Sequence, residues 1–232
     1  SNGGKYNKNA VNNYVSFANF LWRIVRINED GSIRLILNKP INDTLYHFNP
    51  DSDGSYSYMY YSNSDVENGM KRTIDTWYNE NLKNYESYIA DTEFCEQFKV
   101  SDSSTWATTG SATVPVKENY TSNFKCSTDG NGKGVLTSKA GLLTIDEAIH
   151  AGNYFGKESS SYITNSNYWY WLMSPTGANR YNAYAWRVGD DGNFYGTSVD
   201  FNDVVRPVIS LKAGLLATGS GTSDDPYLIQ TR

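Results

Sequence analysis

Polar and aromatic side chains crowd the segment from 174 to 204, where Ser, Thr, Asn, Tyr, Asp and Phe fill more than half of the positions. Tyr and Phe offer flat faces for stacking at a small entropic cost, while Asn and Ser offer hydrogen bonds that adapt to a partner. These residue types therefore favour recognition of a ligand. Ordinary loops on an extracellular domain have a similar composition, and the sequence leaves that second interpretation open.

Residues that could catalyse a reaction are scarce. The two histidines, His47 and His150, are far apart, and the chain lacks the GxSxG, HExxH, Walker and GxGxxG motifs. The acidic pairs Asp190-Asp191 and Asp224-Asp225 occur among turn residues, where carboxylates are usually solvated. We therefore expect no enzyme activity and no catalytic residue. A glycosidase stays open as an alternative, because its two carboxylates can be far apart in the sequence.

The sequence also predicts neither a metal site nor a cofactor. Asp51-Ser52-Asp53-Gly54 resembles the start of a calcium loop but lacks the distal glutamate of an EF-hand. Cys95 and Cys126 are the only cysteines, and their spacing is not that of a zinc site. We expect them to form a disulfide that closes a polar loop, which would indicate an extracellular protein. Two unpaired buried thiols are the alternative.

Length and charge narrow the class of protein. A chain of 232 residues fits one large domain or two small ones. Lys and Arg total 20 against 25 Asp and Glu, for a net charge of −5, which argues against a nucleic-acid partner. No apolar run approaches the roughly 20 residues of a membrane-spanning helix.

Hydrophobic patterning predicts strands at both ends of the chain and two helices between them. Residues 14–27 and 32–37 read as a β-hairpin around a turn at 28–31. Apolar residues at three-four spacing predict a helix between 64 and 89. Thr144 and Glu147 form a capping box for a short helix that ends at Gly152. This order predicts an α+β fold of antiparallel strands with two helices.

The remaining segments are predicted from turn and strand signals. Residues 38–63 read as a long loop, and 91–135 as a polar stretch that contains both cysteines. From 162 to 211 short strands alternate with turns, and the segment 219–229 supplies one more strand. His150 is expected to be a partly exposed residue at the end of its helix, without a catalytic role.

Several segments resemble a family of Firmicutes surface proteins with a C-type lectin-like fold, the DUF6273 group. They are NNYVSFANFLWRIVRI, TWYNENLKNYESYIADTEFC, GLLTIDEAIHAG, NYWYWLMSP, AWRVGDDG and VVRPVISLK, in this order. The most specific element is a Trp-rich strand that ends in Ser174-Pro175, followed by a closing Val205-Arg206-Pro207-Val208. The resemblance implies a single C-type lectin-like domain over 14–232, with Arg206 as a buried structural ion. Residues 1–13 would be a linker or cloning remnant after a removed N-terminal anchor.

The layout also resembles the variable proteins that diversity-generating retroelements diversify between such a Trp-rich strand and a terminal VRPV. The resemblance implies that Trp186 and Val188 are framework. The implied ligand-binding positions are Asn179, Tyr181, Asn182, Tyr184, Asn193, Tyr195, Ser198, Asp200 and Asn202. The EPN or QPD and WND tripeptides of calcium-dependent lectins are absent from the chain, so the resemblance does not extend to calcium-dependent sugar binding.

Together these features predict a recognition or adhesion domain on a bacterial cell surface. Its partner would be a protein or glycan on another cell, a phage or a host, with no nucleic acid and no cofactor. A structural alternative is a pilin-like or surface-stalk subunit whose Tyr-rich surface packs against neighbouring copies.

Overall fold

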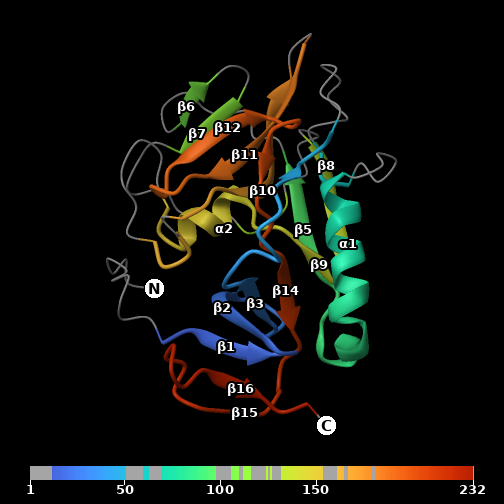
Figure 1. Cartoon of the computed structure of the whole chain (residues 1–232), viewed down its shortest axis with the longest axis vertical. Helices are drawn as coiled ribbons and strands as arrows, with labels where there is room; N and C mark the ends of the chain where they lie inside the picture. Colours follow the sequence, from blue (N-terminus) through green and yellow to red (C-terminus); the bar gives the residue numbers. More distant parts are fainter. Residues whose placement is uncertain are drawn as a thin grey trace.

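The computed structural model describes residues 12–50, 60–62, 69–97, 106–109, 112–115, 124, 126, 132–153, 161–164, 167–178 and 181–231. Most strands are antiparallel, and two α-helices accompany them, so the α+β class is confirmed (Figure 1). Within the described ranges, no helix reaches the length and apolarity needed to cross a bilayer. The proposed linker at 1–13 and the calcium-like segment at 51–54 lie wholly or mostly outside the described residues.

The largest sheet lies at one pole of the molecule (Figure 1). Its strands follow the order β15-β16-β1-β2-β3-β14-β9, and every neighbouring pair is antiparallel except β1 and β16. Their bounds are Tyr14–Phe17 for β1, Phe20–Ile27 for β2, Ile33–Leu37 for β3, Ala140–Gly141 for β9, Val208–Leu211 for β14, Ala217–Thr218 for β15 and Tyr227–Ile229 for β16. The predicted hairpin around 28–31 is confirmed as β2 and β3, and the predicted strand in the tail is β16.

Residues 14–27 form two strands rather than the single strand expected. Ala18 and Asn19 have φ angles of 52° and 65°, and the chain reverses there between β1 and β2. Positive φ at both positions of a two-residue loop is the geometry of a type I′ hairpin turn. Alanine rarely adopts this conformation, so the sequence carries only a weak turn signal at this place.

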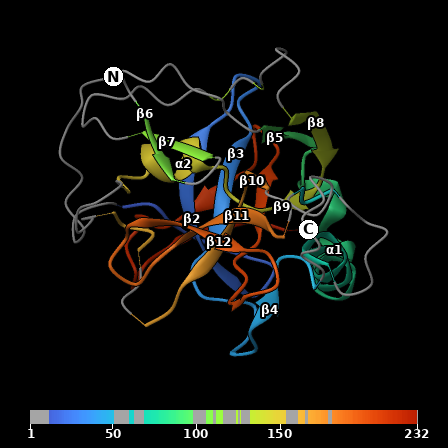
Figure 2. The same ribbon diagram turned by 90° about the horizontal axis from the view of Figure 1, so that it is seen from above.

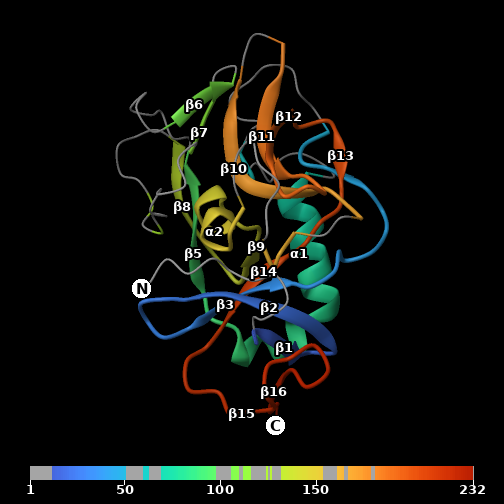
Figure 3. The same cartoon turned by 90° about the vertical axis from the view of Figure 1, so that its left-hand side faces the viewer.

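A second, smaller sheet lies toward the opposite pole. It consists of β10 (Tyr170–Ala178), β11 (Ala183–Val188) and β12 (Phe194–Ser198), which pair antiparallel in that order. Next to it, β13 (Asn202–Asp203) pairs with β4 (Tyr46–His47), a short strand within the segment expected to be a loop (Figures 2 and 3). The strands predicted between 162 and 211 are confirmed.

Both predicted helices are present. The first, α1 (Met70–Asn81), buries Met70, Ile74, Trp77 and Tyr78 and gives way to a 3-10 helix at Lys83–Tyr88. The second, α2 (Ile145–His150), has the predicted capping box between Thr144 and Glu147.

Polar residues 91–135 contain strands that the sequence did not indicate. They are β5 (Thr92–Gln97), paired with β8 (Gly132–Ser138), and β6 (Trp106–Thr109), paired with β7 (Ala112–Pro115). The predicted disulfide between Cys95 and Cys126 is present. It fastens residue 126 to the buried middle of β5, beside Phe94, which is inaccessible to solvent. Burial of Phe94 and Cys95 gives this segment an apolar anchor.

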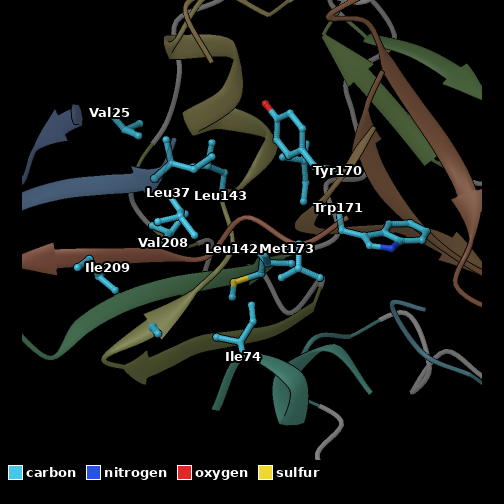
Figure 4. Close-up of a cluster of buried hydrophobic side chains, with 14 of the residues drawn as sticks. Val25, Leu37, Ile74, Leu142, Leu143, Tyr170, Trp171, Met173, Val208 and Ile209 are labelled. Carbon is cyan, nitrogen blue, oxygen red and sulfur yellow. The ribbon is translucent and has the colours of Figure 1, made fainter. Parts of the chain in front are cut away.

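One apolar core joins the two sheets and both helices. Leu142 and Leu143 precede α2 and lie close to Met173 of β10 and Val208 of β14 (Figure 4). The amide of Met173 donates a 2.7 Å hydrogen bond to the carbonyl of Leu143, which ties the second sheet to this centre. All four side chains are almost fully buried, so the second sheet is fixed to the scaffold through β10.

Arg206 is buried at the closing VRPV, as expected. Its Nε donates to the carbonyl of Leu37 at 2.9 Å, its Nη1 to that of Ile163 and its Nη2 to that of Asn38. Its guanidinium also lies 4.8 Å from the ring centre of Tyr170. These contacts connect the main sheet to β10 and give Arg206 a structural role.

Candidate functional site

Arg187 organises the face of the second sheet that lies toward β13. Its Nη1 donates to Oδ2 of Asp203 at 2.8 Å, and its guanidinium carbon lies 4.4 Å from the ring centre of Trp169. Burial raises the pKa of the Asp203 carboxyl, and Arg187 opposes that shift. Charge pairing and ring stacking thus fix Arg187, Asp203 and Trp169 relative to one another.

Tyr195 extends this arrangement along β12. It is the cross-strand partner of Arg187, and its ring centre lies 4.5 Å from that of Trp169. Its hydroxyl donates to Oδ2 of Asp191 at 2.8 Å. Burial, reinforced by this hydrogen bond, raises the pKa of Tyr195. Trp169 therefore packs over two neighbouring side chains of one sheet face, and we expect little mobility in its ring.

The turn between β11 and β12 is also braced. Oδ1 of Asp191 accepts the amide of Asn193 at 2.9 Å, and Gly192 adopts a φ of 80°. Burial alone would raise the pKa of Asp191, but hydrogen bonds from Asn193 and Tyr195 hold it below its usual value. From the end of α2, the fully buried Asn153 donates to the carbonyl of Gly192 at 2.9 Å. The turn is thereby tied to the scaffold.

A cleft of about 650 Å³ opens beside Trp169. We call it the Trp169 cleft, and its walls come from the loop before β4, the segment before β10, and β13. Lining side chains include Lys39, Asp43, Leu45, Trp169, Asn202 and Asp203. This volume lies within the roughly 300–1,000 Å³ of pockets that take small ligands or side chains of a partner.

The predicted ligand-binding residues divide between the two faces of the second sheet. Tyr184 pairs with Ser198 on one face, and Asn182 donates to the Tyr184 hydroxyl at 3.3 Å. Tyr195 belongs to the other face. It pairs with Arg187, which lies three residues after Tyr184 on β11 and therefore points to the opposite side of the sheet. Strand register thus separates Tyr184 from Tyr195.

The predicted ligand-binding residues also differ in how far their side chains are exposed to solvent. Tyr181 is 62% exposed, and Asp200 and Asn202 are exposed on the segment that leads into β13. By contrast, Ser198 Oγ and Asn193 Oδ1 are buried and have no hydrogen-bond partner within the described ranges. Asn179 lies outside the described residues. Of the nine positions, Asn202 lines the Trp169 cleft.

Trp186 and Val188 are buried, as expected for framework positions. The sequence did not indicate Trp169, Arg187 or Asp203 as site residues. Strand alternation carried a partial signal, because Arg187 must face away from the buried Trp186 and Val188 on either side of it.

The two histidines have separate surroundings within the described residues. Nδ1 of His47 contacts the carbonyl of Asp200, which joins β4 to the segment before β13. His150 lies against the Phe124 ring, and burial lowers the pKa of its imidazole. Across the described ranges, no three His, Cys, Asp or Glu side chains come together in a way that could hold a metal ion.

Comparison with known proteins identifies a family. No curated protein and no solved structure matches the chain. The family model described as "Domain of unknown function (DUF6273)" matches residues 34–213, which include both helices, the second sheet and every described residue of the Trp169 cleft. The match spans well over half of the sequence, and the chain therefore belongs to the DUF6273 family.

Proposed function

We propose that the chain is a recognition domain on a bacterial cell surface, which binds a ligand in the Trp169 cleft and over neighbouring residues between 181 and 202. The observation that carries this proposal is the cleft wall. Trp169 and Asp203 are both held by Arg187, at 4.4 Å and 2.8 Å, before any ligand arrives. A wall fixed in advance loses little entropy when a partner binds, which increases affinity.

Two features support an extracellular domain of the C-type lectin-like kind. The disulfide between Cys95 and Cys126 suits an oxidising compartment. The division into a main sheet, in which β1 adjoins β16, and a second sheet with long connections agrees with the fold that the sequence motifs suggest. The proposal assigns ligand contacts to the connections of the second sheet.

Diversification of this region by a retroelement is part of the same proposal. Trp186 and Val188 are buried, while Asn182 and Tyr184 beside them are only partly buried, so substitutions could change the surface without disturbing the framework. Sequencing the gene region from several isolates tests this idea. A nearby template repeat, with differences confined to codons between 176 and 203, is expected. Uniform sequences without a repeat would contradict diversification.

The binding proposal is tested by screening the purified chain against glycan and host-protein arrays, with calcium and with a chelator. We expect a signal that persists in chelator and weakens at least about tenfold in the double variant Tyr181→Ala/Asn202→Ala. Both side chains are exposed, so the fold should be unaffected. Leu228→Ala is the matched control, because Leu228 is also exposed but belongs to β16, which lies at the opposite pole. Silence on both arrays, or equal binding by the double variant, would contradict recognition.

A further inference from the structure

Negative charge gathers around the Trp169 cleft. Two carboxylates, Asp43 and Asp203, line the cleft, and Asp200 is exposed two residues before the cleft-lining Asn202. Arg187 is already paired with Asp203. Of the described residues that line the cleft, Lys39 alone carries a positive charge. With Arg187 and Asp203 neutralising each other, the carboxylates of Asp43 and Asp200 outnumber the ammonium of Lys39, which favours a cationic ligand.

The cleft-lining Asp203 uses one of its two carboxylate oxygens to pair with Arg187. Arg187 engages Oδ2 of Asp203, whereas Oδ1 has no hydrogen-bond partner among the residues described. The Asp203 side chain is only 8% exposed, so its orientation is fixed. A charged donor that reached Oδ1 would form a short, charge-assisted hydrogen bond with a carboxylate that is already in place.

Large apolar side chains are exposed at the same place. Leu45 lines the cleft and is 56% exposed, and Phe201, next to the cleft-lining Asn202, is also 56% exposed. Trp169 lines the same cleft as Leu45. Aromatic and aliphatic anchors of this kind dominate the energetics of protein interfaces. A hydroxyl-rich ligand such as a glycan would leave Leu45 and Phe201 poorly covered.

We propose that the Trp169 cleft binds a segment of a partner protein in which a bulky apolar side chain lies beside arginine or lysine. This inference rests on the proposed recognition function and specifies its ligand as a protein segment rather than a glycan. The apolar side chain packs against Leu45 and Trp169. The cation pairs with Asp203 and with the exposed carboxylates of Asp43 and Asp200.

The test uses four short synthetic peptides that carry either two arginines or two glutamates beside either a phenylalanine or a serine. Binding is followed through the indole N–H signals of the six tryptophans in ¹⁵N-labelled protein, with Trp169→Phe used to assign the Trp169 signal. We expect the peptide with arginine and phenylalanine to shift the Trp169 signal saturably. Because the pairing is electrostatic, raising the ionic strength should weaken this binding.

Charge variants distinguish an effect of the cleft carboxylates on binding from an effect of the protein's overall net charge. Asp43→Asn and Asp200→Asn should each weaken binding of that peptide by about two- to fivefold. Asp224→Asn removes the same charge from an exposed residue near β16 and should leave binding unchanged. Leu45→Ser should also weaken binding, because it removes the apolar anchor.

Other results would overturn the inference. They include equal binding of the glutamate peptides, no shift of the Trp169 signal with any peptide, and equal effects of Asp43→Asn and Asp224→Asn. A glycan from the array that shifts the Trp169 signal would also overturn it, while the proposed recognition function would stand. Only the array screen, with its Tyr181→Ala/Asn202→Ala variant, can contradict the recognition function itself.

Discussion

Arg34 of β3 and Glu147 of α2 form an ion pair in the interior, with 2.8 Å between Nε and Oε1. Their side chains are 1% and 2% exposed, and Arg26 adds a second contact to the same carboxylate oxygen at 3.1 Å. Glu147 also accepts the amide of Thr144 at 3.0 Å. A single carboxylate therefore caps α2 and joins it to the main sheet.

Loss of the Glu147 carboxylate should strongly destabilise the folded protein. Glu147→Gln keeps the size of the side chain but leaves Arg34 buried without a counter-charge, so we expect the free energy of unfolding to fall by about 3–5 kcal/mol. Urea denaturation measures the change. Glu29→Gln, at an exposed position of the same sheet's β2–β3 turn, is the control and should change stability by less than about 0.5 kcal/mol. A similar effect of both substitutions would contradict a structural role for the pair.

The same group predicts how stability depends on pH. Burial by itself would raise the pKa of Glu147, but Arg34 and Arg26 hold it below its ordinary value. A carboxyl with a lowered pKa in the folded state stabilises the protein above its unfolded pKa of about 4.3 and loses that contribution as the pH falls through its folded pKa. The difference in stability between the natural protein and Glu147→Gln should be constant near neutral pH and shrink below about pH 4. Melting curves across this pH range measure the difference in stability. A difference that grows on acidification would contradict a lowered pKa for Glu147 in the folded state.

The disulfide should contribute more than any exposed contact. Cys95 and Cys126 are 31 residues apart, and a crosslink over such a loop stabilises a protein by about 3–4 kcal/mol through the entropy of the unfolded chain. We expect the double variant Cys95→Ser/Cys126→Ser to lose about that amount in urea denaturation. A reducing agent should destabilise the natural protein and have no effect on the double variant. Equal sensitivity of both proteins to the reducing agent would rule out this explanation.

The two tyrosines near the site should differ in their effect on stability. Tyr181 is 62% exposed, so Tyr181→Ala should change the free energy of unfolding by less than about 0.5 kcal/mol. Tyr195→Ala removes the ring contact with Trp169 and the hydrogen bond to Asp191, and we expect a loss of about 1–3 kcal/mol. Tyr195→Phe retains the ring and removes only the hydrogen bond, so its loss in the free energy of unfolding should be smaller than that of Tyr195→Ala. Thermal melts compare the three, and equal losses from Tyr181→Ala and Tyr195→Ala would contradict the packing described.

Local signals explain which elements could be predicted from the sequence. The capping box of Thr144 and Glu147 spans four residues, and the buried side chains of α1 repeat at helical spacing, so a short window contains the whole pattern. The turn at Ala18 and Asn19 was missed because its conformation depends on the pairing of β1 with β2 rather than on a glycine. Strand β5 was missed because its two apolar residues, Phe94 and Cys95, are adjacent and flanked by polar residues, so no alternating pattern marks the strand.

The candidate site depends on tertiary contacts, which the sequence shows only in part. Tyr181 and Asn202 were predicted because the resemblance to retroelement-diversified proteins implies ligand contacts between the Trp-rich strand and the terminal VRPV. Arg187 and Asp203 lie 16 residues apart on different strands, and they meet only because β13 returns alongside the second sheet. The register of β11 and β12, which separates Tyr184 from Tyr195, likewise cannot be read from composition.

The parallel pairing of β1 with β16 also determines how the molecule can be attached to a surface. Both strands lie at the pole away from β13, so the first and last strands of the fold meet on the side opposite the Trp169 cleft (Figures 1 and 3). A tag, a bead or a display scaffold fused after β16 would hold the domain with its cleft pointing outward. In such an orientation neighbouring copies could crowd at their bases while each cleft stayed open to a partner.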